Sequence, residues 1–207
     1  LKVLDNDNGD TALLLYSPVL PLVASERSVR HLWRMAEPGR PNVVEARQAL
    51  STLDPKNAEP LRFALLDLNG DAVARKAAIT QLAEIEIDPR RRQEVTKALI
   101  SAMATPTFIS DTKGEALDAT LFRWGNDYVY TNLQKTLGDE FANPDARATA
   151  IGTLARTGQS KYAAAIARWV LKEPEPVVAA LRRMGAAGES EAVRLLSDKS
   201  ADARKYG

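Results

Sequence analysis

One spacing pattern, which occurs three times, constrains the fold of this chain more than any other feature. An apolar residue stands eight positions before a glycine and a leucine stands four positions before it, and the three glycines are Gly125, Gly158 and Gly185. Residues four apart lie on one face of a helix, and a glycine after the last turn readily adopts the left-handed conformation that ends it. The pattern therefore predicts helices with a left-handed exit at each glycine. Second helices that turn back are expected over residues 126–137, 159–171 and 190–196.

The remaining sequence from about residue 26 indicates helices as well. Little of it alternates between polar and apolar residues as strands do, and most of the eleven prolines stand where one helical pattern stops and the next begins. Thr105–Lys113 is expected to be a longer connection, and residues 1–25 an irregular or partly helical segment. The sequence thus predicts an all-α fold. Side-chain caps are expected at Asn57, Asp71, Asp88, Asn126, Asn143, and Ser200 or Asp202.

The helical pattern has a regular interval. A fourth unit carries Ala78 and Leu82 in the repeat positions without the glycine, and its partner helix opens after Pro89. Successive units begin 43, 30, 30 and 25 residues apart, an interval typical of helix-hairpin solenoids. We expect one repeat domain over residues 26–207. Because the chain starts at Leu1 and its last residues form the opening turn of a further helix, we also expect it to be a piece cut inside another repeat.

Two units open with the same three residues, Asp-Ala-Arg, at Asp145 and at Asp202, and Arg75 stands relative to Leu82 as Arg147 does to Leu154. With these motifs the chain resembles HEAT-repeat proteins, specifically the short HEAT-like repeats of phycobilisome-lyase proteins and of large bacterial multidomain proteins. The resemblance implies a HEAT-like α-solenoid, a right-handed superhelix of antiparallel helix pairs. First helices would lie on its convex side and second helices on its concave side. It also implies a scaffold for recognition rather than a particular chemistry.

The composition argues against most catalytic and cofactor-binding functions. The 28 Lys and Arg nearly balance the 27 Asp and Glu, no cysteine is present, and His31 is the single histidine. No glycine-rich phosphate loop occurs, and the acidic runs that begin at Asp5 and Asp67 lack EF-hand spacing. Carboxylate pairs at helical spacing, such as Glu115 and Asp118, are interpreted as solvated. We therefore expect no enzyme activity, no metal and no cofactor.

Other single residues receive structural interpretations. We interpret His31 as a residue at the core boundary, and Trp33 and Trp124 as packing wedges. The longest apolar stretch, residues 12–24, is interrupted by a serine and two prolines and is too short for a membrane span. No membrane span is expected in this chain, and the sequence leaves its cellular compartment open.

The predicted function is a non-catalytic scaffold for protein–protein interaction, which presents polar and aromatic side chains of the second helices to a protein partner. Because Tyr128 and Tyr130 are two residues apart, we expect one of them to pack and the other to be more exposed. One alternative is nucleic-acid backbone binding through a basic row made of Arg90–Arg92 and Arg168. Another is an enzyme like the phycobilisome lyases, which would bind a chromophore. The predicted partner-binding residues are Arg91, Tyr128, Tyr130, Lys161, Arg168 and Trp169.

Overall fold

The computed structural model describes residues 25–207, which contain thirteen α-helices and no strand. The all-α prediction is confirmed for this part of the chain. The chain divides into two compact units, residues 1–85 and 86–207. The predicted repeat domain, residues 26–207, extends over both units. The expected irregular segment, residues 1–25, and the acidic run at Asp5 lie outside the described residues except for Ser25.

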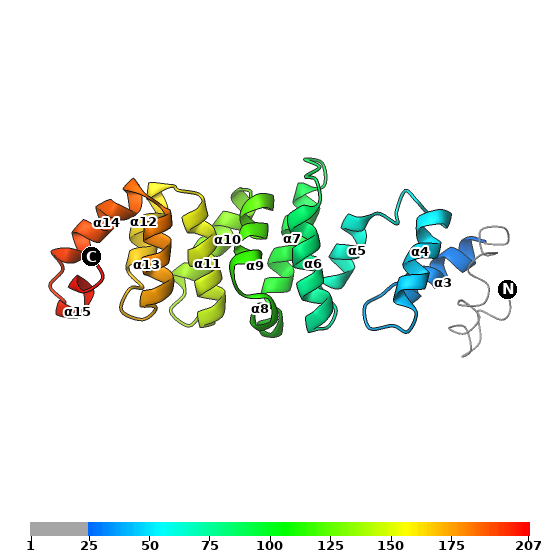
Figure 1. The fold of residues 1–207 in the computed structure, drawn as a ribbon, viewed down its shortest axis with the longest axis horizontal. Helices are drawn as coiled ribbons and strands as arrows, with labels where there is room; N and C mark the ends of the chain where they lie inside the picture. Colours follow the sequence, from blue (N-terminus) through cyan, green and yellow to red (C-terminus); the bar gives the residue numbers. More distant parts are fainter. Residues whose placement is uncertain (1–24) are drawn as a thin grey trace. The chain divides into compact units, whose positions relative to one another are not determined.

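The described part of the first unit contains four helices: α3 (Glu26–Met35), α4 (Val43–Leu53), α5 (Pro60–Asp67) and α6 (Ala72–Glu84). Helix α3 packs on α4, and α5 packs on α6 (Figure 1). Leu32 and Leu50 are fully buried between α3 and α4, and Phe63 of α5 joins the same core cluster. His31 is half-buried on α3, and Trp33 packs at the edge of this core with its indole N–H donating to Asp54.

The second unit contains the nine remaining helices. These are α7 (Arg92–Met103), α8 (Pro106–Thr112), α9 (Glu115–Trp124), α10 (Asp127–Gly138), α11 (Pro144–Arg156), α12 (Ser160–Ala167), α13 (Pro174–Arg183), α14 (Ala186–Leu196) and α15 (Ala201–Arg204). The prediction that Thr105–Lys113 is a connection is wrong. Pro106 opens helix α8 there, because Phe108 and Ile109 have an apolar core to enter and are almost fully buried.

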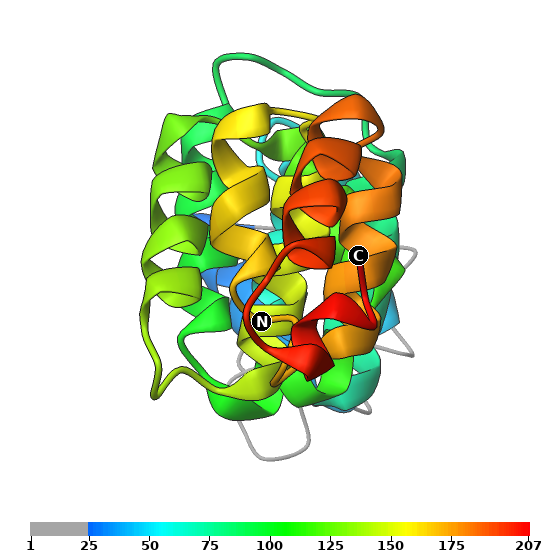
Figure 2. The ribbon, with the colours of Figure 1, turned by 90° about the vertical axis from the view of Figure 1, so that its left-hand side faces the viewer.

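Within this unit the longer helices form two layers. Helices α9, α11 and α13 contact one another in chain order and make the first layer; α10, α12 and α14 do the same and make the second (Figure 1). Figure 2 looks along both layers, with α14 and α15 nearest the viewer. The layers meet where α11 contacts both α10 and α12, and where α13 contacts both α12 and α14. The leucines of the repeat pattern, Leu121, Leu154 and Leu181, are all buried in this unit.

The two glycines that end α11 and α13 behave as the pattern predicts. Gly158 has φ of 64° and Gly185 has φ of 59°, both in the left-handed region. The same prediction is wrong at Gly125, whose φ is −53°. A β-carbon at Gly125 would overlap the ring of Tyr130, so this glycine is required by the close approach of an aromatic side chain. Glycine at this position therefore has a packing cause rather than a conformational one.

Side-chain caps mark several helix starts as predicted. Asp71 accepts from Ala74 N–H, Asn126 from Val129 N–H, Asn143 from Asp145 N–H, and Ser200 from Ala203 N–H. Asp88 accepts from Arg90 N–H within a turn, and Asn57 caps no helix, since its side chain donates to Asp54. No helix among the described residues combines the length and the apolarity that crossing a bilayer requires.

Candidate functional site

Three of the residues expected to contact a partner are exposed on the second layer. Tyr128 lies in the first turn of α10 with 46% of its surface exposed. Lys161 lies in the first turn of α12 and Arg168 is the residue that caps its end, and both are exposed. These three residues, which we call the second-layer surface, come from two neighbouring helices that contact each other.

Tyr130 is less accessible than Tyr128, as the two-residue spacing predicts. Its ring is half-buried against Gly125, and burial raises the pKa of its hydroxyl. Its hydroxyl lies 3.5 Å from the carbonyl oxygen of Phe122 at the end of α9. Tyr130 therefore joins two consecutive helices, and only part of the ring is open to a partner.

Trp169 does not belong to a partner surface, which corrects the sequence-based prediction. The residue is 3% exposed, and its indole N–H donates to the carbonyl oxygen of Leu137 at 2.9 Å. The guanidinium of Arg147 lies 3.9 Å from the centre of its ring. Because a buried indole needs a partner for its N–H, the end of α10 provides one, and the ring becomes part of the core.

Three arginines of the predicted basic row have side-chain partners inside the protein. Arg91 forms an ion pair with Glu94, and Arg92 donates to the carbonyl oxygen of Gly125 at 3.0 Å. Arg168 donates to the carbonyl oxygens of Leu137 and Gly138 at 3.0 and 3.2 Å, where it caps the end of α10. A phosphate would have to compete with these contacts.

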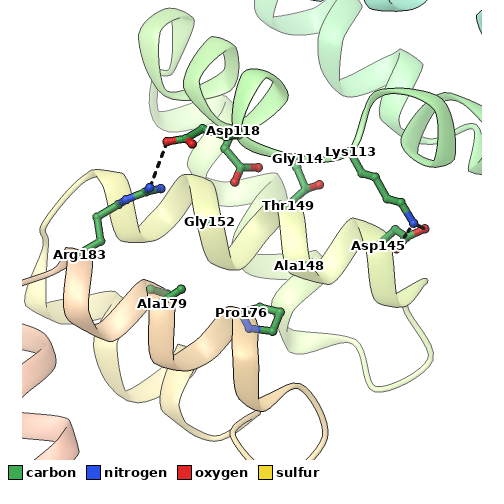
Figure 3. A pocket seen from close by; sticks show the side chains of 12 residues that line it. Lys113, Gly114, Asp118, Asp145, Ala148, Thr149, Gly152, Pro176, Ala179 and Arg183 are labelled. Carbon is green, nitrogen blue, oxygen red and sulfur yellow. Dashed lines mark hydrogen bonds and ion pairs between the residues drawn. The ribbon is translucent and has the colours of Figure 1, made fainter.

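A pocket of about 350 Å³ lies on the opposite, first layer, between α9, α11 and α13 (Figure 3). Small residues make its floor: Ala148 and Gly152 come from α11, and Pro176, Ala179 and Ala180 from α13. Its remaining lining residues are Lys113, Gly114, Glu115, Asp118, Asp145, Thr149 and Arg183. None of the predicted partner-binding residues lies on this layer.

Ion pairs close the two ends of the pocket. At one end Lys113 binds Asp145, with its ammonium 3.0 Å from a carboxylate oxygen. At the other end one oxygen of Glu115 accepts from Arg156 of α11 at 2.8 Å and from Arg183 of α13 at 3.2 Å. The Glu115 side chain is nevertheless 75% exposed. It bridges two arginines from two other helices while facing solvent, a geometry in which ion pairs contribute little net stability.

Asp118 lies next to this bridge and corrects the interpretation of Glu115 and Asp118 as a solvated pair. Figure 3 shows its side chain pointing from α9 toward α11, where a β-carbon on Gly152 would overlap its carboxyl group. Burial raises the pKa of Asp118 to about 7, against the opposing pull of Arg156 and Arg183, and Glu115 adds to the rise. Its oxygen Oδ1 is buried and accepts no hydrogen bond from the part of the chain described here.

The sequence contained a signal for this site that spacing alone did not identify. Gly152 stands inside α11, where a glycine lowers helix stability relative to alanine, so its presence needs a packing reason. The reason is the Asp118 carboxyl group on the next helix of the layer. Recognising it required knowing that α9 and α11 are neighbours.

No group of three or more His, Cys, Asp or Glu side chains among residues 25–207 could hold a metal ion. Comparison with models of known protein families gives no match to this chain, and comparison with curated proteins gives none either.

Proposed function

We propose that this chain is a HEAT-like helical-repeat protein, an α-solenoid, that binds other proteins and catalyses no reaction of its own. The observation that carries the proposal is the two-layer order of the second unit, in which three successive first helices and three successive second helices contact their neighbours in chain order. Such stacking produces an extended surface, because each helix of a layer adds its outward side chains to those of the next. The Asp-Ala-Arg openings and the glycine-ended repeats support the same proposal.

The partner would be an extended segment of another protein lying across α10 and α12. Tyrosine and arginine are enriched among the residues that dominate protein interfaces, and the second-layer surface offers Tyr128 and Arg168 together with Lys161. Arg168 keeps its carbonyl partners on α10 and is held in place by them, so it would meet a partner with little loss of side-chain entropy. The buried ring of Trp169 packs against the Arg168 guanidinium of this surface.

The test places a photo-activated cross-linking residue at Ala164, which is exposed between Lys161 and Arg168 on α12. In cells of the source organism we expect a protein adduct that persists after nuclease treatment and is lost in the double variant Tyr128→Ala/Lys161→Ala. A cross-linker at Glu175, exposed on α13 in the first layer, is the matched control and should not yield the same adduct. Equal adducts from both positions would contradict the proposed surface.

Nucleic-acid binding is the alternative outcome of the same experiment. An adduct that disappears with nuclease, together with an affinity that falls steeply with salt, would assign the surface to phosphate contacts. The protein partner is favoured because Arg91 and Arg92 of the basic row are already engaged by Glu94 and by the carbonyl oxygen of Gly125.

A further inference from the structure

Four side chains of the second unit form a cluster in which some polar atoms have hydrogen-bond partners and others have none. Glu115 and Asp118 come from α9, Arg156 from α11 and Arg183 from α13. Glu115 receives both arginines, whereas Asp118 Oδ1 receives no hydrogen bond and Arg156 Nε donates none, although both atoms are buried. A buried donor and a buried acceptor without partners are costly, and here they belong to residues of opposite charge within one cluster.

The protonation state of Asp118 determines whether Glu115 keeps both arginines. Burial raises its pKa to about 7, so the carboxyl group is neutral in mildly acidic solution and exerts little attraction on the arginines. Above that pH it becomes a carboxylate in a site of low polarity, where Arg156 and Arg183 are the cations that act on it and Glu115 is the competing anion. Helix α7 also packs against α9 and, among the described residues, supplies no charge to this cluster.

We propose that Asp118 is a proton-controlled switch at the junction of α9, α11 and α13: on losing its proton it takes Arg156 from Glu115. The geometry favours transfer because the exposed Glu115 loses little when water replaces an arginine, whereas Asp118 gains its missing donor. The proton goes to solvent and no covalent bond changes. Loss of the proton adds one negative charge to the pocket, and the transfer leaves Glu115 paired with Arg183 alone.

The closeness of α9 and α11 makes the junction sensitive to this change. Gly152 leaves no space between the Asp118 carboxyl group and the backbone of α11, so the carboxylate cannot move into that helix to find water. The cations that act on it there are the two arginines. The same contact explains why the effect should remain inside the first layer, where α9, α11 and α13 contact one another in order.

The test is an NMR titration of the full chain with ¹³C-labelled carboxyl groups and ¹⁵N-labelled arginine side chains, from pH 4 to 9. We expect the Asp118 carboxyl signal to titrate near pH 7 and the Arg156 Nε signal to shift with the same midpoint. Titration of Asp118 near pH 4 would overturn the proposal. An Arg156 signal that does not change through the Asp118 midpoint would overturn it equally, since it would leave a buried acid without any exchange of partners.

Two variants test whether the charges of Glu115 and Arg183 act on Asp118, while the Arg156 Nε signal reports the exchange itself. Glu115→Gln removes the competing anion, and we expect the Asp118 midpoint to fall by at least about one pH unit, a tenfold change in acidity. Arg183→Gln removes one of the two cations and should raise the midpoint. Glu140→Gln, at an exposed position in the loop after α10, is the matched control and should leave the midpoint unchanged. A midpoint that does not respond to Glu115→Gln or Arg183→Gln would refute the switch.

Discussion

Each unit contains an arginine that ion pairs and hydrogen bonds hold between helices. The two arginines are buried to different degrees. In the first unit Arg47 of α4 makes a two-pronged ion pair with Asp67 of α5, donates to the carbonyl oxygen of Ala36 at 3.1 Å, and lies over the ring of Phe63. In the second unit Arg147 of α11 pairs with Glu173 and donates to the carbonyl oxygens of Asp139 and Ala142. It lies over the ring of Trp169.

The two arginines differ in exposure. The Arg47 side chain is 21% exposed, whereas that of Arg147 is 6% exposed. Arg147 holds the loop before its own helix and the residue before α13 at once, because Glu173 precedes that helix. A buried arginine is stabilising only when its carboxylate and its carbonyl partners are all present. The comparison therefore predicts graded costs for removing each arginine.

Arg147→Ala should have the largest effect. We expect it to lower the free energy of unfolding by about 3–5 kcal/mol, because it leaves the Glu173 carboxylate buried without its cation and two loop carbonyl groups without donors. Urea denaturation followed by circular dichroism measures the loss. Arg182→Ala, at an exposed position on α13, is the control and should change stability by less than about 0.5 kcal/mol. A loss below about 1 kcal/mol for Arg147→Ala would contradict the comparison.

Arg47→Ala should cost less, about 2–3 kcal/mol, since the Arg47 side chain is more exposed than that of Arg147 and donates to one carbonyl oxygen instead of two. Hydrogen exchange locates the effect. We expect faster exchange in α4 and α5, and unchanged exchange in α11 and α13. If Arg47→Ala proved more damaging than Arg147→Ala, exposure would not be what ranks the two arginines.

A rise in pH should weaken the second unit and leave the first nearly unaffected. The folded-state pKa of Asp118 is about 7 and its unfolded value is near 3.8, so the folded chain holds the extra proton between these values. The stabilising contribution is complete below pH 4 and is lost as the pH rises through 7. Between pH 5 and 8 we expect a loss of about 2–3 kcal/mol.

Hydrogen exchange in α9 and α11, corrected for its intrinsic pH dependence and referenced to α5 and α6, measures this loss. Asp118→Asn replaces the neutral acid by a neutral amide of the same shape and should remove the pH dependence. Stability that falls equally in both units, or that still falls in Asp118→Asn, would show that another group is responsible.

Arg204→Ala should have the smallest effect, below about 1 kcal/mol. Arg204 stands in the second Asp-Ala-Arg opening and donates to the loop carbonyl oxygens of Asp198 and Lys199 at 2.7 and 3.0 Å, as Arg147 does in its own loop. Arg204 is exposed and its recorded partners are backbone carbonyl oxygens, so water can replace it. Differential scanning calorimetry would measure the change. A cost equal to that of Arg147→Ala would mean that the loop contacts, and not the buried ion pair, account for both.

Local patterns in the sequence predicted the local structure well. The spacing of Leu121, Leu154 and Leu181 before a glycine identified buried helix positions, and Asn126 and Asn143 were correctly assigned as caps. Helix periodicity and capping depend on residues within one or two turns, so the sequence contains what they need. The all-α class followed from them.

The predictions were wrong where the environment of a residue depends on another residue that is distant in the sequence. Tryptophan is a residue type that is common at interfaces. The burial of Trp169 depends on Leu137, which lies 32 residues earlier. Gly125 has the position of a left-handed terminator, yet its φ is −53° and a β-carbon there would overlap the Tyr130 side chain. Asp118 has helical spacing from Glu115, and its burial depends on Gly152 of another helix. Only the packing of helices on one another decides such cases.

The end of α10 has a consequence for the order in which the chain folds. The carbonyl oxygen of Leu137 accepts from the side chains of both Arg168 and Trp169, which the ribosome adds about thirty residues later. Until those residues leave the exit tunnel, the last turn of α10 has only water for these carbonyl groups. A nascent chain that pauses before residue 168 should therefore hold a frayed α10, and synthesis of the next helix pair should complete the one before it.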